Sequence, residues 1–215
     1  LGVAPVSAVA DQLTIDGGTL VMTGTSTVSI NVNRGITVGS GGATIDNSAI
    51  TTNFADGNLN SIITGTGPIT LISNGNTTDG GGGNGSELRL ANTANTFTGN
   101  VTINSGVVGF NGDGSFGNTA NDIVIVGGGL VATSTITLPA TRDIVLSGGG
   151  DKIFRMYGGV TFTIEGNITG TGNVRHTDGG ILNLNGDNSF TGNVLAVRGT
   201  TTFSGTNTYT GYTFV

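Results

Sequence analysis

Apolar and polar residues alternate along this chain in short runs that are separated by glycine and asparagine. Examples are residues 13–22 (LTIDGGTLVM), 88–92 (LRLAN) and 160–166 (VTFTIEG). Alternation with a period of two is typical of a half-buried β-strand. No run of 10 or more residues has the spacing of an amphipathic helix. The pattern therefore predicts an all-β protein with many short strands and tight turns.

The chain also contains a long internal repeat. Four segments of the first half recur in order in the second half: 13–30 as 123–138, 34–45 as 142–153, 62–67 as 167–172 and 97–101 as 190–194. The offset falls from 110 (123 − 13) to 93 (190 − 97), as expected if loops are shorter in the second copy. We therefore expect an N-terminal arm of residues 1–10 and two tandem units of one continuous solenoid, residues 11–121 and 122–215.

A finer period lies within these units. The turn at Asn188 recurs at Asn207, 19 residues later (207 − 188). A period of about 20 residues suits one rung of a right-handed parallel β-helix, a β-solenoid whose rungs are stable only when stacked. Because stacked strands lie about 4.8 Å apart, roughly ten rungs would form a rod on the order of 50 Å long. Threonine and asparagine are expected to form side-chain ladders from rung to rung.

Composition adds mainly exclusions. Glycine makes up 41 of 215 residues without a Gly-X-Y period, which excludes collagen. A hydrophobic fraction of 35% and a net charge of −6 argue against disorder. The seven Lys and Arg residues are scattered among 13 Asp and Glu, so nucleic acid is not an expected partner. No apolar run approaches the roughly 20 residues of a membrane helix, so no membrane span is predicted.

The best candidate for catalytic chemistry is the segment VRHTDGG, residues 174–180. It places Arg175, His176 and Asp178 close together, with Lys152 about one rung away, and a histidine with a carboxylate can act as acid and base. However, neighbouring strand residues point to opposite faces, and no second carboxylate lies near Asp178 in the sequence. The segment is interpreted as a solvated turn, and no catalytic residue is assigned. A polysaccharide-degrading enzyme remains a remote alternative.

Ligand motifs are equally weak. Residues 81–88 (GGGNGSEL) approach the calcium-binding nonapeptide of β-rolls, with Glu87 near the acidic position, but the motif occurs once where stacked copies are required. We interpret it as a flexible glycine loop. The triplet TST recurs at 25–27 and 133–135, one unit apart rather than one rung apart, which argues against an ice-binding face. The sequence predicts no metal and no cofactor.

Several phrases carry a family resemblance. Residues 64–101 and 169–194 contain Gly-Thr-Gly, then Asp-Gly-Gly with alternating leucines, then Asn-x-Phe-Thr-Gly-Asn-Val, and residues 33–46 (NRGITVGSGGATID) are of similar character. The chain thereby resembles the passenger-associated transport repeat of autotransporter passenger domains and other large bacterial surface proteins. The resemblance implies a secreted β-helix, and we expect an extracellular or bacterial cell-surface location.

The two ends of the sequence resemble the two halves of one sequence motif. Residues 207–215 (NTYTGYTFV) begin like residues 95–110, whose second half, VTINSGVVGF, is matched by LTIDGGTLVM at 13–22. The first rung of one molecule thus reads as the continuation of the last rung of another, and residues 1–9 are expected to add a strand to the neighbour. The predicted assembly interface comprises Leu1, Val3, Val6, Leu13, Ile15, Leu20, Tyr209, Tyr212, Phe214 and Val215.

These observations predict a structural subunit of an extracellular or cell-surface filament, with copies of itself as partners and no enzymatic activity. One alternative is a rod or passenger segment of a larger bacterial surface adhesin, which would recognise a glycan or host surface through the loop at 77–87. In that case, flanking rungs of a longer chain would cap the ends. A self-capped monomer is the third possibility.

Overall fold

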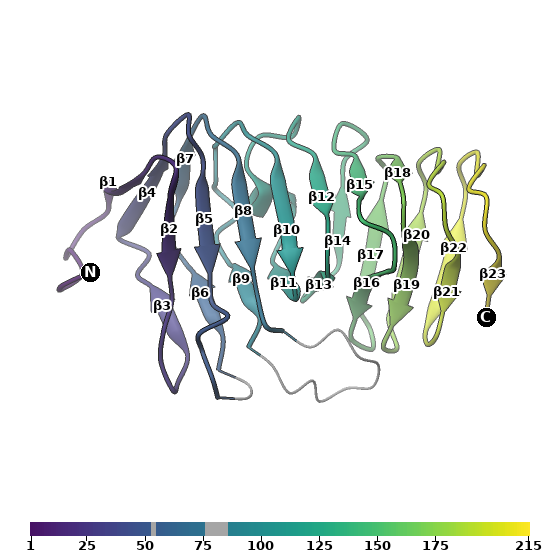
Figure 1. The fold of residues 1–215 in the computed structure, drawn as a ribbon, viewed down its shortest axis with the longest axis horizontal. Coiled ribbons are helices and arrows are strands. Elements are labelled where there is room, and N and C mark those ends of the chain that lie inside the picture. Colours follow the sequence, from purple (N-terminus) through teal and green to yellow (C-terminus); the bar gives the residue numbers. More distant parts are fainter. Residues whose placement is uncertain (53–54, 76–85) are drawn as a thin grey trace.

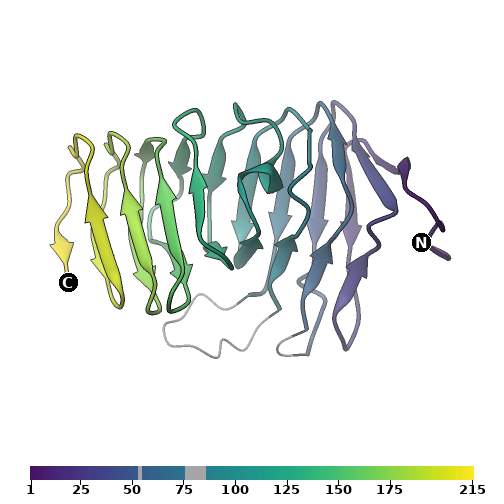
Figure 2. The same cartoon turned by 180° about the vertical axis from the view of Figure 1, so that it is seen from behind.

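The computed structural model describes residues 1–52, 55–75 and 86–215. These residues form 23 β-strands and one short 3-10 helix. The strands lie side by side along the long axis of the molecule, and the chain ends lie at opposite ends of this rod (Figure 1). Seen from behind, the rod has the same stacked arrangement (Figure 2). The predicted all-β class and β-solenoid architecture are confirmed.

The chain winds over three faces in a fixed order. The first face carries two sheets, β1 (Val9–Ile15), β4 (Arg34–Val38) and β7 (Ile63–Gly65), then β14 (Ile136–Leu138), β17 (Thr161–Ile164), β20 (Ile181–Leu184) and β22 (Thr200–Phe203). The second face carries β2 (Gly18–Val21), β5 (Ala43–Asp46), β8 (Ile69–Ile72), β10 (Val101–Ser105), β12 (Ile123–Ile125), β15 (Ile144–Leu146) and β18 (Ile168–Gly170). The third face carries β3 (Val28–Ile30), β6 (Gly57–Leu59), β9 (Leu88–Leu90), β11 (Val107–Phe110), β13 (Gly129–Ala132), β16 (Asp151–Met156), β19 (Asn173–Thr177), β21 (Val194–Ala196) and β23 (Thr213–Phe214).

The register between strands sets the length of each rung. Nine strands on the third face give eight steps (9 − 1), close to the predicted ten rungs. Near the C-terminus, Leu182 pairs with Thr201, a step of 19 residues (201 − 182), which matches the predicted period. Earlier steps are longer, and the pairing of Ile69 with Val101 spans 32 residues (101 − 69). The period is therefore regular only in the second half of the rod.

Inward side chains from the three faces fill one continuous core. On the third face, Val108, Leu130 and Phe154 occupy one inward row in consecutive rungs. Phe162 of the first face contacts the rings of Phe110 and Phe154 at centroid distances of 5.3 and 6.5 Å. Burying one such side chain contributes on the order of 2–3 kcal/mol. Because no rung can bury its own inward row, this core exists only in the stack.

Among the described residues, the first face carries no strand between β7 and β14. The chain crosses this face without a regular element between β9 and β10, and as η1 (Asp113–Phe116) between β11 and β12. Arg142 lies behind this interruption with a fully buried side chain, and its guanidinium pairs with Asp113 and lies over the ring of Phe116. The same guanidinium donates hydrogen bonds to the backbone carbonyls of Phe116, Gly117, Asn118 and Asn121. One arginine thus satisfies the carbonyls that a missing strand leaves without ladder partners.

Polar side chains at the corner between the first and second faces form a ladder. The Asp143 carboxylate accepts a hydrogen bond from the backbone N–H of Asn167, at 2.8 Å. The Asn167 side-chain oxygen accepts from the N–H of Asp187, and the Asp187 carboxylate accepts from the N–H of Thr206. Each side chain therefore accepts from the backbone one rung further along the rod. The predicted threonine and asparagine ladder is present on the first face, where Asn183 donates to the Thr163 hydroxyl at 3.0 Å and accepts from the Thr202 hydroxyl at 2.6 Å.

The corners also demand glycine. Gly128 has φ +81°, and a Cβ at this position would lie 1.6 Å from the carbonyl oxygen of Gly106 in the preceding rung. Gly106 itself has φ +66°. Only glycine allows a left-handed conformation and so close a backbone approach. The glycine content follows in part from corners stacked on corners.

The two copies of the long repeat lie one face apart. The segment ending at Ile15 belongs to β1 on the first face, whereas its counterpart ending at Ile125 forms β12 on the second. Likewise, Val101 begins β10 on the second face and Val194 begins β21 on the third. Sheets continue through residue 121, because β10 pairs with β12 and β11 pairs with β13. The division into residues 1–10, 11–121 and 122–215 remains a prediction from the sequence.

Candidate functional site

Both ends of the rod present open strand edges. Among the described residues, β1, β2 and β3 each have a hydrogen-bonded neighbour on one side only, and the same is true of β22 and β23 at the other end. An open edge offers unpaired N–H and C=O groups as a template for another strand. The two ends are therefore the surfaces on which a further rung would continue this fold.

At the N-terminal end, the last layer of the core is only partly covered. Leu13, Leu20 and Val28 point inward but remain partly exposed. Leu1 lies over a recess of about 310 Å³ between β2 and β3, which is lined by Leu20, Val21, Met22, Thr23, Val28, Ser29 and Ile30. The recess shows that the core is open here to another apolar group.

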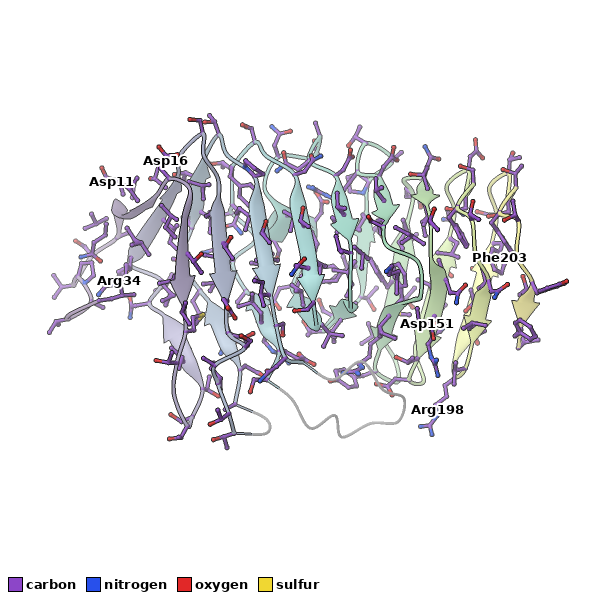
Figure 3. All side chains as sticks on the ribbon, viewed as in Figure 1. Asp11, Asp16, Arg34, Asp151, Arg198 and Phe203 are labelled. Atoms are coloured by element: carbon purple, nitrogen blue, oxygen red, sulfur yellow. The ribbon has the colours of Figure 1, made fainter. Side chains whose placement is uncertain are left out.

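The N-terminal arm is attached to this end through its backbone. Arg34 is buried and donates hydrogen bonds to the carbonyls of Leu1 and Gly2, at 2.7 and 3.2 Å. In Figure 3, Arg34 lies beside the arm. The side chains of Val3 and Val6 are 95% and 101% exposed. The arm is therefore held by main-chain contacts while its apolar side chains face solvent.

Aromatic residues form the last layer of side chains at the C-terminal end. Tyr209 stacks on Phe190 with ring centroids 5.0 Å apart and an interplanar angle of 7°, and Phe203 lies 6.1 Å from Tyr209. Phe203 occupies an inward row because it pairs with the buried Leu184 one rung earlier, yet it is 36% exposed. Figure 3 shows Phe203 at the last rungs of the rod. This end thus offers a partly bare aromatic layer.

The predicted assembly residues divide into three groups. The inward positions of the end rungs hold Leu13, Ile15, Leu20 and Tyr209, and the arm holds Leu1, Val3 and Val6. The last residues of the chain, Tyr212, Phe214 and Val215, are exposed. The groups at the two ends are not brought together within one molecule. The assembly role of these residues remains a prediction.

Phe214, one of the predicted assembly residues, does not occupy an inward position of the last rung. It pairs with Leu195, while the adjacent Thr213 pairs with the core residue Val194. Phe214 therefore faces outward, and a charge placed there would not be buried between rungs. The inward aromatic residue that sequence reasoning missed is Phe203, which its spacing of 19 from Leu184 (203 − 184) would have revealed.

An apolar groove lies beside Phe214 on the outer side of the third face. Its volume is about 320 Å³, and it is lined by Arg175, Leu195, Ala196, Val197, Phe214 and Val215. Val197 and Phe214 are 42% and 55% exposed. Arg175 is paired with Asp151 at 2.6 Å, so the charge at the inner end of the groove is compensated. The groove thus offers mainly apolar contacts to a ligand.

The segment around His176 is not a solvated turn. His176, Thr177 and Asp178 are all buried, because His176 follows Phe154 in an inward row of the third face. The His176 Nδ1 lies 2.8 Å from the hydroxyl of Thr201, and its Nε2 has no hydrogen-bond partner among the described residues. As expected, Arg175 points to the other face. Burial removes the side chains of His176 and Asp178 from solvent, which argues against these two residues as a glycan-cleaving pair.

Lys152 lies one rung from this segment, as the repeat spacing predicts, since it pairs with Val174. Its ammonium group donates hydrogen bonds to the carbonyls of Val126 and Gly149, at 2.7 and 2.6 Å. Burial lowers the pKa of this amine. The residue closes a corner of the rod and does not face His176 as a catalytic partner.

Burial lowers the pKa of His176 to about 4, and the charge of Asp178 acts in the opposite direction. The folded protein therefore holds a neutral imidazole, whereas the unfolded chain takes up a proton below about pH 6.5. We expect a stability contribution that is complete above pH 6.5 and is lost as the pH falls toward 4, by about 3 kcal/mol in total. Urea unfolding of the wild type and of His176→Gln between pH 7.5 and 4 would measure it.

Carboxylates titrate in the same acid range, so the difference between the two proteins is the informative quantity. The glutamine keeps a polar partner for Thr201 but cannot titrate, so the stability advantage of the wild type should shrink as the pH falls. Parallel pH profiles for the two proteins would contradict the assigned pKa shift.

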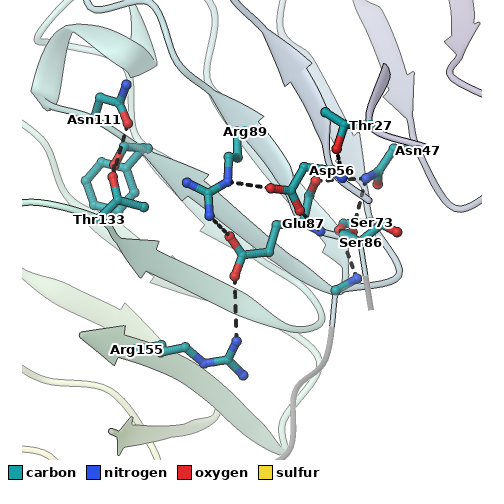
Figure 4. A network of polar contacts seen from close by, with 12 residues as sticks. Thr27, Asn47, Asp56, Ser73, Ser86, Glu87, Arg89, Asn111, Thr133 and Arg155 are labelled. Atoms are coloured by element: carbon teal, nitrogen blue, oxygen red, sulfur yellow. Dashed lines mark hydrogen bonds and ion pairs between the residues drawn. The ribbon is translucent and has the colours of Figure 1, made fainter. Parts of the chain in front are cut away.

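A charged network crosses the outer side of the third face (Figure 4). Arg89 lies between Asp56 and Glu87, at 3.0 and 2.8 Å. Arg155 lies 3.7 Å from both Glu87 and Asp178. Burial raises the pKa of Glu87, and the two arginines counteract this effect. Glu87 is thus engaged in ion pairs rather than in the glycine loop where we expected it; residues 77–85 of that loop lie outside the described residues.

Across the described parts of the chain, no group of three or more His, Cys, Asp or Glu residues is arranged to hold a metal ion. In the same residues, no helix has the length and apolar character needed to cross a bilayer.

Comparisons of the chain with protein-family models, with curated proteins and with solved structures found no match. The resemblance to the passenger-associated transport repeat therefore remains a prediction from the motifs, and the ends of the rod remain the candidate functional surface on geometric grounds.

Proposed function

We propose that this protein is a structural subunit that stacks head to tail into a filament at or outside a cell surface. The observation that carries the proposal is the pair of open ends, where partly exposed inward residues lie beside unpaired strand edges. A contact between two different ends of the same molecule is heterologous, and when it does not close into a ring it produces a fibre. Copies of the chain are the proposed partners, and no catalysis is required.

The arrangement of faces at the two ends supports this joint. Stacking β1 on β22 and β3 on β23 keeps the first and third faces continuous across the joint. The inward rows then meet in matching order, with Leu13 against Thr201 and Ile15 against Phe203 on the first face. On the second face, Leu20 meets the half-buried Tyr209. Two of these three contacts join an apolar side chain to an aromatic ring, and the unpaired edges gain parallel partners.

A rod segment within a larger surface adhesin is the second candidate, and the same end surfaces favour it. In that arrangement, the rungs that cover the ends come from the same longer chain rather than from another copy. The two candidates differ in one observable: only the first requires the isolated 215-residue chain to assemble with itself.

Electron microscopy and analytical ultracentrifugation of the purified chain across a concentration series test the proposal. We expect unbranched fibres above a threshold concentration, with an axial repeat close to the length of one rod. Single short rods at every concentration would overturn the filament and leave the adhesin rod as the better explanation.

A further inference from the structure

The N-terminal arm occupies the end that the proposed joint requires. Leu1 lies over the recess formed with Val28, Ser29 and Ile30, which belong to β3 on the third face. In the stacked arrangement, the neighbour's β23 pairs with this same edge of β3. The arm and the neighbour's last rung therefore compete for one place, and the arm must move away when the ends meet.

Detaching the N-terminal arm from the first rung requires little free energy. The displaced part is residues 1–8, because Val9 and Ala10 belong to β1. The hydrogen bonds that hold residues 1–8 come from Arg34 and from Asn33, whose side-chain amide donates to the carbonyl of Pro5 at 3.0 Å. Leu1, Val3 and Val6 are 65%, 95% and 101% exposed, so little apolar surface is lost when the arm leaves. An extended segment of eight residues reaches about 26 Å, which exceeds the spacing of several rungs at about 4.8 Å each.

The groove beside Phe214 lies within that reach and on the same side of the rod. Leu1 of the arm lines the recess at the edges of β2 and β3 in its own first rung, and the groove lies on the outer side of the third face at the last two rungs. After stacking, these positions are adjacent across the joint. β21 is hydrogen-bonded to β19 and β23 on its two sides, so the groove offers side chains rather than a free strand edge.

We propose that the arm of one copy docks in the groove of the next copy and so fastens the joint from outside. The proposal rests on head-to-tail stacking as the proposed function. Leu1, Val3 and Val6 leave solvent and pack against Leu195, Val197 and Phe214. Each buried aliphatic side chain adds hydrophobic stabilisation to a joint whose core contact is limited to one rung on each side.

Cysteine cross-linking tests the arm and the stacking separately, because the chain has no cysteine of its own. The arm pair is Val6→Cys in one copy and Val197→Cys in another. The stacking pair is Thr14→Cys and Thr202→Cys, two exposed positions that would lie side by side on the first face across the joint. Each pair of variants is mixed above the assembly threshold and treated with a short bismaleimide.

We expect both pairs to form covalent dimers. Cross-linking of the stacking pair alone would overturn the arm inference and leave the filament intact. Absence of both products would overturn the stacking together with the arm contact. A product from the arm pair alone would support the docking and overturn the proposed joint.

Two controls make the result specific. A single chain carrying both Val6→Cys and Val197→Cys should give no internal cross-link at high dilution. Val197 directly follows β21, which lies at the opposite end of the rod from the N-terminus (Figure 1). Leu195→Asp places a charge in the groove and should reduce the yield of the arm pair at least about tenfold while the stacking pair still reacts. An unchanged arm yield would overturn the assignment of the groove.

Discussion

Replacement of Arg142 by methionine should lower the free energy of unfolding by about 3–5 kcal/mol. We expect no larger loss of stability from the substitution of any other buried polar residue. Its side chain has 0% exposure and ties Asp113 and four backbone carbonyls to the point where the first face loses a strand. Methionine fills much of the volume but donates no hydrogen bond, so Asp113 loses its ion pair and the carbonyls of Gly117 and Asn121 lose the guanidinium donor. Equilibrium urea unfolding at pH 7 measures the difference.

Arg198→Met is the matched control, since Arg198 is exposed at a turn of the C-terminal rungs (Figure 3). Its substitution should change stability by less than about 0.5 kcal/mol. If Arg142→Met were to cost no more than Arg198→Met, the guanidinium would not be the group that supports the interrupted face.

Charges placed on the inward rows of the end rungs should abolish assembly while leaving single rods folded. Leu20→Asp at one end and Phe203→Asp at the other each put a carboxylate where the neighbour's core would lie. A desolvated carboxylate without a partner costs several kcal/mol, and about 3 kcal/mol already raises the concentration needed for assembly by about a hundredfold. Sedimentation of assembled protein against concentration provides the measurement.

Ile181→Asp makes the same type of change at an outward position of similar exposure, 40% against 36% for Phe203. This control lies within the stack rather than at an end and should assemble like the wild type. Circular dichroism checks that all three variants keep the β signal. Equal assembly of the end variants and the control would refute the joint.

The strands were largely predictable because the stacking of rungs imposes the same few requirements on every rung. A residue that faces the core must be apolar, its neighbour faces out, and a corner that stacks on another corner needs glycine, as at Gly128. Alternation and glycine spacing therefore indicated the solenoid, and the step of 19 to 20 residues in the last rungs was readable from the recurrence of Asn188 at Asn207.

Other features depend on contacts that no local pattern encodes. The turn of η1 is stabilised by Arg142, which lies 29 residues from Asp113 (142 − 113), so the sequence around η1 gives no sign of its partner. The segment around His176 was interpreted as a solvated turn, but the register of His176 with Phe154 places it inside the core. Of the candidate site, the inward positions Leu13, Leu20 and Tyr209 followed from the repeat. The outward direction of Phe214, the role of Arg34 and the position of the groove required the fold.

Because the two long repeats are displaced by one face, equivalent segments of the two repeats lie on different faces of the rod. The turn Gly65–Thr66–Gly67 joins the first face to the second, while its counterpart Gly170–Thr171–Gly172 joins the second to the third. A peptide grafted into both turns would be displayed on two sides of the rod rather than in one row. A bivalent binder with a short linker would therefore reach only one graft at a time, and the duplication supplies two separate directions of presentation from a single sequence motif.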